Sequence, residues 1–140
     1  MNTRLCVTAA LMLIGLHAQA ADPSNPPPTV KEGPCPSYIE TGVWFYRDNE
    51  WTLSLTPSTC GRQIGEDEIA HMFYEVAQKF SGSRFWENDR GLINQLRCHL
   101  NNARDKPEWN LEPWRPAVSY AKTADAKCNV FDPDPDPPFE

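Results

Sequence analysis

Residues 38–56, which read YIETGVWFYRDNEWTLSLT, decide the fold of this chain. Both ends of this stretch are rich in β-branched and aromatic residues, and residues 51–56 alternate apolar and polar side chains as a half-buried strand does. The polar triplet Asp48-Asn49-Glu50 between them is typical of a tight turn. The stretch therefore predicts a β-hairpin whose second strand ends at Pro57. The side chains expected on the buried face of that strand are Trp51, Leu53 and Leu55.

Apolar residues at helical spacing follow the hairpin. Residues 66–80 carry such a pattern, and three acidic residues in the first turn complement the helix dipole. A second amphipathic helix is predicted from Gly91 to Arg104, with His99 inside its apolar arc. An Ala-rich run from Pro116 to Lys127 predicts a last short helix that begins at the proline. The expected fold class is α+β, with a small antiparallel hairpin or sheet packed on two to three helices and cross-linked by two disulfides.

The two ends of the chain differ in composition from its middle. The first twenty residues combine a positive Arg4, an apolar run and a small-x-small site at Ala18-Gln19-Ala20, so they predict a signal peptide and a secreted or periplasmic protein. The apolar run is too short for a membrane-spanning helix, which needs about 20 residues. The predicted organisation is a signal peptide at residues 1–20, a Pro-rich linker at 21–37, one disulfide-stabilised domain at 38–130 and an acidic Asp-Pro tail at 131–140.

The overall composition excludes several classes of function. The 140 residues include 13 basic and 19 acidic side chains, which give a formal charge of -6. No run of Lys or Arg occurs that would neutralise phosphates, so a nucleic-acid partner is not expected. The sequence also lacks the G-x-S-x-G and H-E-x-x-H motifs, which removes the commonest hydrolase sites. No cofactor is expected.

The cysteines predict disulfides and not a metal site. Removal of the signal peptide with Cys6 leaves four cysteines, an even set that indicates two disulfides in an exported chain. Four cysteines allow three pairings, and we predict the pairing in chain order because it closes two loops of moderate length. Zinc is not expected, because no C-x-x-C pair occurs and Cys98 is directly followed by His99. The predicted disulfides join Cys35 to Cys60 and Cys98 to Cys128.

The segment WNLEPWRP at residues 109–116 has the most unusual composition. Exposed Trp offers a large contact area at low entropic cost, and Arg recognises carboxylates with two hydrogen bonds, so such a loop is typical of a binding surface. A structural role is the alternative, with both Trp rings in the core and Glu112 paired with Arg115 or Arg104. We expect the first Trp to be a buried anchor, and the second Trp and the arginine after it to face outward. The candidate binding residues are Trp109, Asn110, Trp114 and Arg115.

Two functions of different classes remain open. The first is a non-catalytic exported domain that binds an envelope or extracellular protein or glycan through residues 109–116. The second is a small secreted hydrolase or toxin, in which His99 and Glu112 provide acid and base, and Arg115 or Arg104 stabilises an anionic transition state. Convergence of these side chains in an open cleft would favour the enzyme, whereas exposed Trp rings would favour the binding domain.

The motifs of this chain resemble those of a known family. The positions that carry the resemblance are Trp44, Leu53, Thr56-Pro57, Gly61-Arg62, Cys98-His99, Ala103-Arg104, Lys106-Pro107, the segment 109–116, Tyr120 and Cys128-Asn129. Over residues 38–129 the chain resembles the domain of unknown function 2599 family of exported bacterial proteins. That family often continues Cys-Asn-Pro-Gly, whereas this chain has Val130-Phe131 after Asn129, so its terminus differs. The resemblance implies an exported single domain and no established chemistry.

Overall fold

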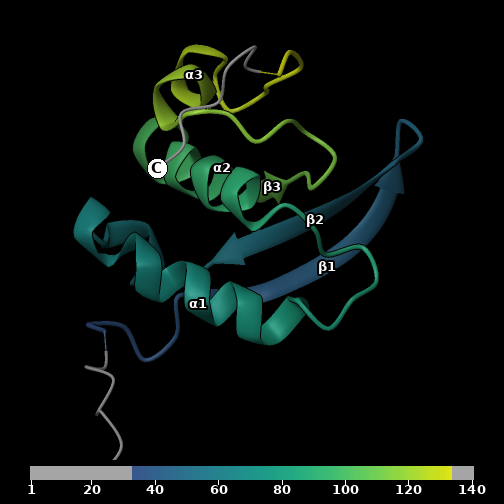
Figure 1. Ribbon diagram of the computed structural model, residues 1–140. Coiled ribbons are helices and arrows are strands. Elements are labelled where there is room, and N and C mark those ends of the chain that lie inside the picture. The colour runs from purple at the N-terminus through teal and green to yellow at the C-terminus, as the bar shows by residue number, and fades with distance from the viewer. Residues whose placement is uncertain (1–32, 134–140) are drawn as a thin grey trace, which may run out of the picture. The chain divides into compact units, whose positions relative to one another are not determined.

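The computed structural model describes residues 33–133, so the predicted signal peptide and most of the predicted linker and tail lie outside the described residues. The elements, in chain order, are β1 (Ile39–Arg47), β2 (Glu50–Pro57), α1 (Ile69–Phe80), α2 (Asp89–Asn102), β3 (Trp109–Leu111) and α3 (Tyr120–Asp125), with short 3-10 turns at Gly61–Gln63 and Glu66–Glu68. Helices α1 and α2 lie side by side against the sheet, and α3 lies beyond α2 (Figure 1). The predicted α+β fold is confirmed.

The predicted hairpin of β1 and β2 is present, with Arg47 opposite Glu50 at its tip. Asp48 and Asn49 make the turn between them with φ of 54° and 66°. A two-residue hairpin turn of this hand needs positive φ at both positions, and Asn and Asp are the side chains that tolerate it best after Gly.

A third strand, which the sequence did not predict, completes the sheet in the order β1-β2-β3. The strand β3 runs antiparallel to β2 and places Trp109 opposite Leu55 and Leu111 opposite Leu53. Because side chains of a strand alternate between its two faces, Trp109 and Leu111 enter the core and Asn110 lies on the other face. Three residues are too few to show this alternation in the sequence, which is why the segment was expected to be a loop.

Two side chains of α2 hold β3 where no further strand pairs with it. His99 Nε2 donates to the carbonyl oxygen of Asn110 at 2.9 Å. Gln95 pairs with both backbone groups of Glu112: its Oε1 accepts from the amide at 2.8 Å, and its Nε2 donates to the carbonyl oxygen at 3.0 Å. Residues four apart on a helix lie on one face, one turn apart. The helix therefore positions both side chains along β3.

The hydrophobic core lies between the sheet and helices α1 and α2. The fully buried apolar side chains of these elements are Ile39, Leu53, Leu55, Met72, Val76, Leu92, Leu96, Leu100, Trp109 and Leu111. Both predicted disulfides are confirmed. The Cys35–Cys60 bond ties the segment before β1 to the turn after β2, and the Cys98–Cys128 bond ties α2 to the segment after α3.

The helix boundaries differ from the prediction where polar caps decide them. Helix α2 begins two residues earlier than expected because Asn88, at φ 60°, accepts the Gly91 amide on its side chain at 3.0 Å. Helix α3 begins at Tyr120 and not at Pro116, because the Ser119 hydroxyl caps it by accepting the Lys122 amide.

Candidate functional site

The two Trp rings of the segment 109–116 have different environments. Trp109 is 0% exposed, and its ring is nearly parallel to that of His99, with an interplanar angle of 9°. Trp114 is half-buried and lies 6.1 Å from the ring of Phe131, which is exposed. The expectation that Trp109 is a buried anchor agrees with this arrangement, whereas Trp114, which was expected to face outward, is only partly exposed and its Nε1 atom is buried.

The expectation that Arg115 faces outward is wrong, because its side chain is only 6% exposed. Its Nε donates to the carboxylate of Glu112, its Nη1 to the carbonyl oxygen of Val130 at 3.0 Å, and its Nη2 to the side-chain oxygen of Asn129 at 3.3 Å. The guanidinium therefore ties the loop before α3 to the segment after it. Charge-assisted hydrogen bonds of this kind make a buried arginine tolerable.

Aromatic rings enclose the same guanidinium. The Arg115 carbon Cζ lies 4.3 Å from the ring centre of Trp114 and 4.6 Å from that of Phe131. Such cation–π contacts are strongest where the cation is desolvated. The half-buried Trp114 therefore has a structural role in this loop, in addition to any contact that its exposed part makes.

Side-chain amides from the beginning of α2 fix the rest of the loop. Asn88 Nδ2 donates to the carbonyl oxygens of Pro113 and Arg115, at 3.1 and 2.6 Å. Asn94 Nδ2 donates to the carbonyl oxygen of Val118 at 2.8 Å. Sequence reasoning missed these positioning residues. Their only signal was an excess of amide residues in a helix, where Asn is a poor helix former without a polar partner.

A pocket of about 410 Å³ opens beside β3, and we call it the polar pocket. Four parts of the chain form it: the end of β1, the C-terminal end of α2, the residues around β3, and α3 with the segment after it. The lining residues are Arg47, His99, Asn102, Ala103, Lys106, Glu108, Asn110, Glu112, Arg115, Ala124, Lys127, Cys128 and Asn129. Its volume is within the range of small-molecule sites.

The His99 imidazole in the wall of the pocket is neutral at neutral pH. Burial lowers the pKa of His99 and the nearby positive charge of Lys106 acts in the same direction, although the Asn110 carbonyl and Glu112 oppose them. Because Nε2 donates to the Asn110 carbonyl, the proton of the neutral ring is on Nε2 and Nδ1 carries a lone pair. That Nδ1 atom is buried and has no hydrogen-bond partner among the described residues.

A second unpaired polar atom belongs to Asn110. Its side-chain oxygen Oδ1 is buried without a hydrogen-bond partner in the described part of the chain. His99 and Asn110 both line the polar pocket. Each of the two unpaired atoms exposes less than 1 Å², so a molecule in the pocket reaches it only when the side chain turns toward the pocket. The pocket therefore has two unpaired polar atoms in neighbouring walls.

The structure brings together most of the residues predicted for catalysis, but not in a catalytic arrangement. His99, Glu112 and Arg115 all line the polar pocket. Arg104 does not, because its guanidinium donates to the carbonyl oxygens of Leu100, Arg62 and Ile64. His99 has Nε2 on a backbone carbonyl and Nδ1 unpaired, so no hydrogen bond joins it to the carboxylate of Glu112.

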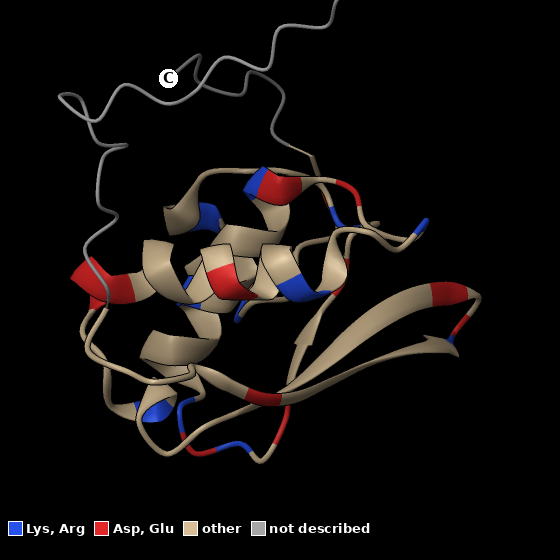
Figure 2. Ribbon diagram, turned by 90° about the horizontal axis from the view of Figure 1, so that it is seen from below, with Lys and Arg blue, Asp and Glu red and all other residues tan. Residues whose placement is uncertain are grey.

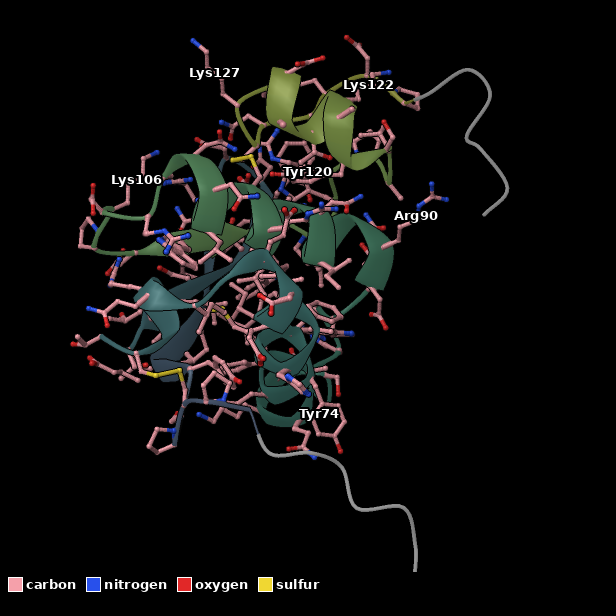
Figure 3. All side chains as sticks on the ribbon, turned by 90° about the vertical axis from the view of Figure 1, so that its left-hand side faces the viewer. Tyr74, Arg90, Lys106, Tyr120, Lys122 and Lys127 are labelled. Carbon is pink, nitrogen blue, oxygen red and sulfur yellow. A yellow bond between two sulfur atoms is a disulfide. The ribbon has the colours of Figure 1, made fainter. Side chains whose placement is uncertain are left out.

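The charged residues around the pocket are unevenly distributed. Lys106 and Lys127 extend from the same edge of the molecule, whereas Arg90 lies on the other side in that view (Figure 3). Neither lysine forms an ion pair with another described residue. Over the described residues as a whole, acidic and basic positions are scattered among each other along the ribbon (Figure 2).

The described residues contain neither a metal cluster nor a membrane-spanning helix. Within residues 33–133, no group of three or more His, Cys, Asp or Glu side chains could hold a metal ion. None of the helices in that range is long and apolar enough to cross a membrane.

The chain has relatives of known sequence. The family model described as "Protein of unknown function (DUF2599)" matches residues 39–130. Uncharacterised proteins of Mycobacterium bovis and of two strains of Mycobacterium tuberculosis are each 27% identical over 139 residues, which cover 90% of this chain and 91% of the relative. No solved structure matches the chain.

Proposed function

The chain belongs to the DUF2599 family of proteins of unknown function, and on that premise we propose that it is an exported, non-catalytic domain that binds an envelope or extracellular partner in the polar pocket. The segment 109–116 contributes Asn110, Glu112 and Arg115 to the wall of this pocket. The proposal keeps that segment as the functional one. It moves the contact surface from the Trp rings to the polar residues of the same segment.

The unpaired polar atoms of His99 and Asn110 are the observation that carries this proposal. A buried polar atom without a partner costs about 1–3 kcal/mol, and native proteins pair nearly all such atoms. The Nε1 atoms of Trp44, Trp109 and Trp114 are also buried and unpaired among the described residues, but none of these tryptophans lines the polar pocket. A ligand with complementary hydrogen-bonding groups that reaches the atoms of His99 and Asn110 recovers their cost when it binds.

Two features support export. Residues 1–20 have the sequence of a signal peptide, and both disulfides join cysteines that are far apart in the sequence. Disulfides of this structural kind persist in oxidising compartments. A protein that is secreted or periplasmic meets envelope proteins and glycans, which are the partners we expect.

The hydrolase or toxin alternative has weaker support. An acid–base pair needs its members within hydrogen-bond reach of each other or of the reacting proton. Here the Glu112 carboxylate pairs with Arg115, whose guanidinium is already occupied by the loop and by the segment after α3. The arginine is thus a structural cation and is not available to stabilise a transition state.

A fragment titration followed by NMR tests the proposal. The probe is a library of small neutral and charged polar compounds at millimolar concentration, added to residues 21–140 labelled with ¹⁵N. We expect saturable shifts of the amides of Ala103, Asn110 and Asn129, which line the pocket. Shifts scattered over the surface, or no saturable shift, would contradict the proposal.

A matched pair of variants provides the control. Ala103→Phe places a large side chain at the pocket wall and should abolish the shifts. Ala70→Phe makes the same change at an exposed position of α1 outside the pocket and should leave them intact. Equal binding by both variants would show that the fragments bind elsewhere.

A further inference from the structure

The polar pocket combines two kinds of recognition group. Positive charges of Lys106, Lys127 and Arg47 lie among its lining residues, and both lysines are exposed. The uncharged groups are the side chains of His99 and three asparagines. A ligand that satisfies both sets must carry a negative charge and also hydrogen-bonding groups without charge.

The positive charge is available to a ligand. Lys106 and Lys127 have no ion-pair partner among the described residues. Arg47 has a solvent-exposed ion pair with Asp48 at 3.4 Å, and its Cζ lies 5.4 Å from the ring centre of Phe45. Glu108 is the one acidic lining residue that does not pair with Arg115, so the cations outnumber it. A protein with a formal charge of -6 that keeps a locally positive pocket attracts anions to that place.

The uncharged groups specify more than an anion. The lone pair of His99 Nδ1 and the oxygen Oδ1 of Asn110 are acceptors that each expose less than 1 Å². Each can pair with a donor of the ligand when its side chain turns the atom toward the pocket. Carboxylates and fully ionised phosphates are acceptors only, and they leave both atoms unpaired. Hydroxyl groups donate, and they supply the missing hydrogen bonds.

The pocket also excludes some ligands by what it lacks. Apart from the imidazole of His99, no described residue that lines it is aromatic. Nucleobases therefore find no broad stacking surface there. From these observations, and building on the proposed function, we propose that the ligand is a hydroxylated anion: a small molecule or terminal group that carries a carboxylate or a phosphate next to hydroxyl groups.

Four probes separate the two requirements. Glycerol 3-phosphate and gluconate carry both features, glycerol has hydroxyl groups only, and inorganic phosphate has the charge only. Dissociation constants from NMR titration of the pocket amides should be at least about tenfold lower for one or both hydroxylated anions than for glycerol and phosphate. Binding of glycerol 3-phosphate alone identifies a phosphate source, and binding of gluconate alone a carboxylate source.

Variants assign each feature to its residues. The double variant Lys106→Ala/Lys127→Ala removes two exposed charges and should weaken binding of the hydroxylated anions about tenfold. Arg90→Ala removes an exposed charge outside the pocket and should change nothing. Asn110→Ala should reduce the preference for glycerol 3-phosphate over phosphate, because the preference depends on the hydroxyl contacts.

Several results would overturn the inference. Equal affinity for phosphate and glycerol 3-phosphate would show that the pocket does not recognise hydroxyl groups. An unchanged affinity of the double lysine variant for the hydroxylated anions would show that the pocket does not recognise their negative charge. If neutral polar fragments shift the pocket amides but neither hydroxylated anion does, the inference on ligand class fails while the proposed binding function stands.

Discussion

Polar side chains beside β3 fall into two groups that differ in how completely they are paired. Glu112 and Arg115 are buried together, and the arginine makes hydrogen bonds to three different residues. His99 and Asn110 both line the polar pocket, and each keeps one buried polar atom unpaired. The comparison teaches that the first group holds the fold together, whereas the second group is poorly explained by the fold alone.

The alternation of β3 explains why one short segment contains both groups. Trp109 and Leu111 point into the core, so the residues between and after them face the pocket. From there Glu112 can meet Arg115, which the loop brings back toward it. Asn110 meets no such partner. The segment is therefore a structural anchor on one face and a wall of the proposed site on the other.

Removal of the buried anchor should have the largest effect. Trp109→Ala should lower the free energy of unfolding by about 3–5 kcal/mol, because the ring is fully buried in the core. Trp114→Ala is the matched change at the half-buried ring and should cost about 1 kcal/mol. Urea denaturation measures both. An equal loss of unfolding free energy in the two variants would show that this segment does not divide into a core residue and a residue outside the core.

The paired group should show the next largest effect. Arg115→Met should cost about 3 kcal/mol, because it leaves the buried Glu112 carboxylate without its cation. The double variant Arg115→Met/Glu112→Leu should recover part of that loss, since it removes both charges. A single variant as stable as the natural protein would mean that the arginine is not structural and is free for a ligand.

The imidazole of His99 should add a smaller, pH-dependent effect. Its pKa in the folded protein is lowered below the ordinary value of 6.5, so the unfolded chain binds the proton more readily. Stability should therefore fall as the pH is lowered through about 6.5, by at most about 1.4 kcal/mol per pH unit. Chemical denaturation at pH 7.5, 6.5 and 5.5 measures the slope.

His99→Gln should remove this part of the slope, because glutamine does not titrate. His71→Gln changes a histidine at the surface of α1 and serves as the control. An unchanged slope in His99→Gln would show that the imidazole is not held neutral by burial.

The fold could be predicted where local pattern decides it. The alternation in residues 51–56 and the turn at Asp48-Asn49 predicted the hairpin. The even number of cysteines predicted two disulfides but allowed three pairings, of which the pairing in chain order, the one we chose, is present. The burial of Arg115 could not be predicted, because its partners come from residues 129–131, on the far side of α3. A local pattern does not show which distant segment supplies a hydrogen-bond acceptor.

The candidate site could be predicted only in part. His99 and Glu112 were expected to meet if the loop folded back over the helix, and both line the polar pocket. The role of Asn110 as an unpaired group depends on β3 and on the His99 contact, and neither is visible in three residues of sequence. The lysines at the pocket were not predicted, because they come from two different loops.

The free energy of unfolding of Asn110→Val tests most directly whether the unpaired group serves binding and not the fold. Valine removes the unpaired oxygen and is favoured in a strand, so the variant should be as stable as the natural protein or more stable by up to about 1 kcal/mol. A urea titration gives the answer without knowledge of the ligand. A loss of 1 kcal/mol or more would contradict the central claim, because it would show that Asn110 is retained for the stability of the fold.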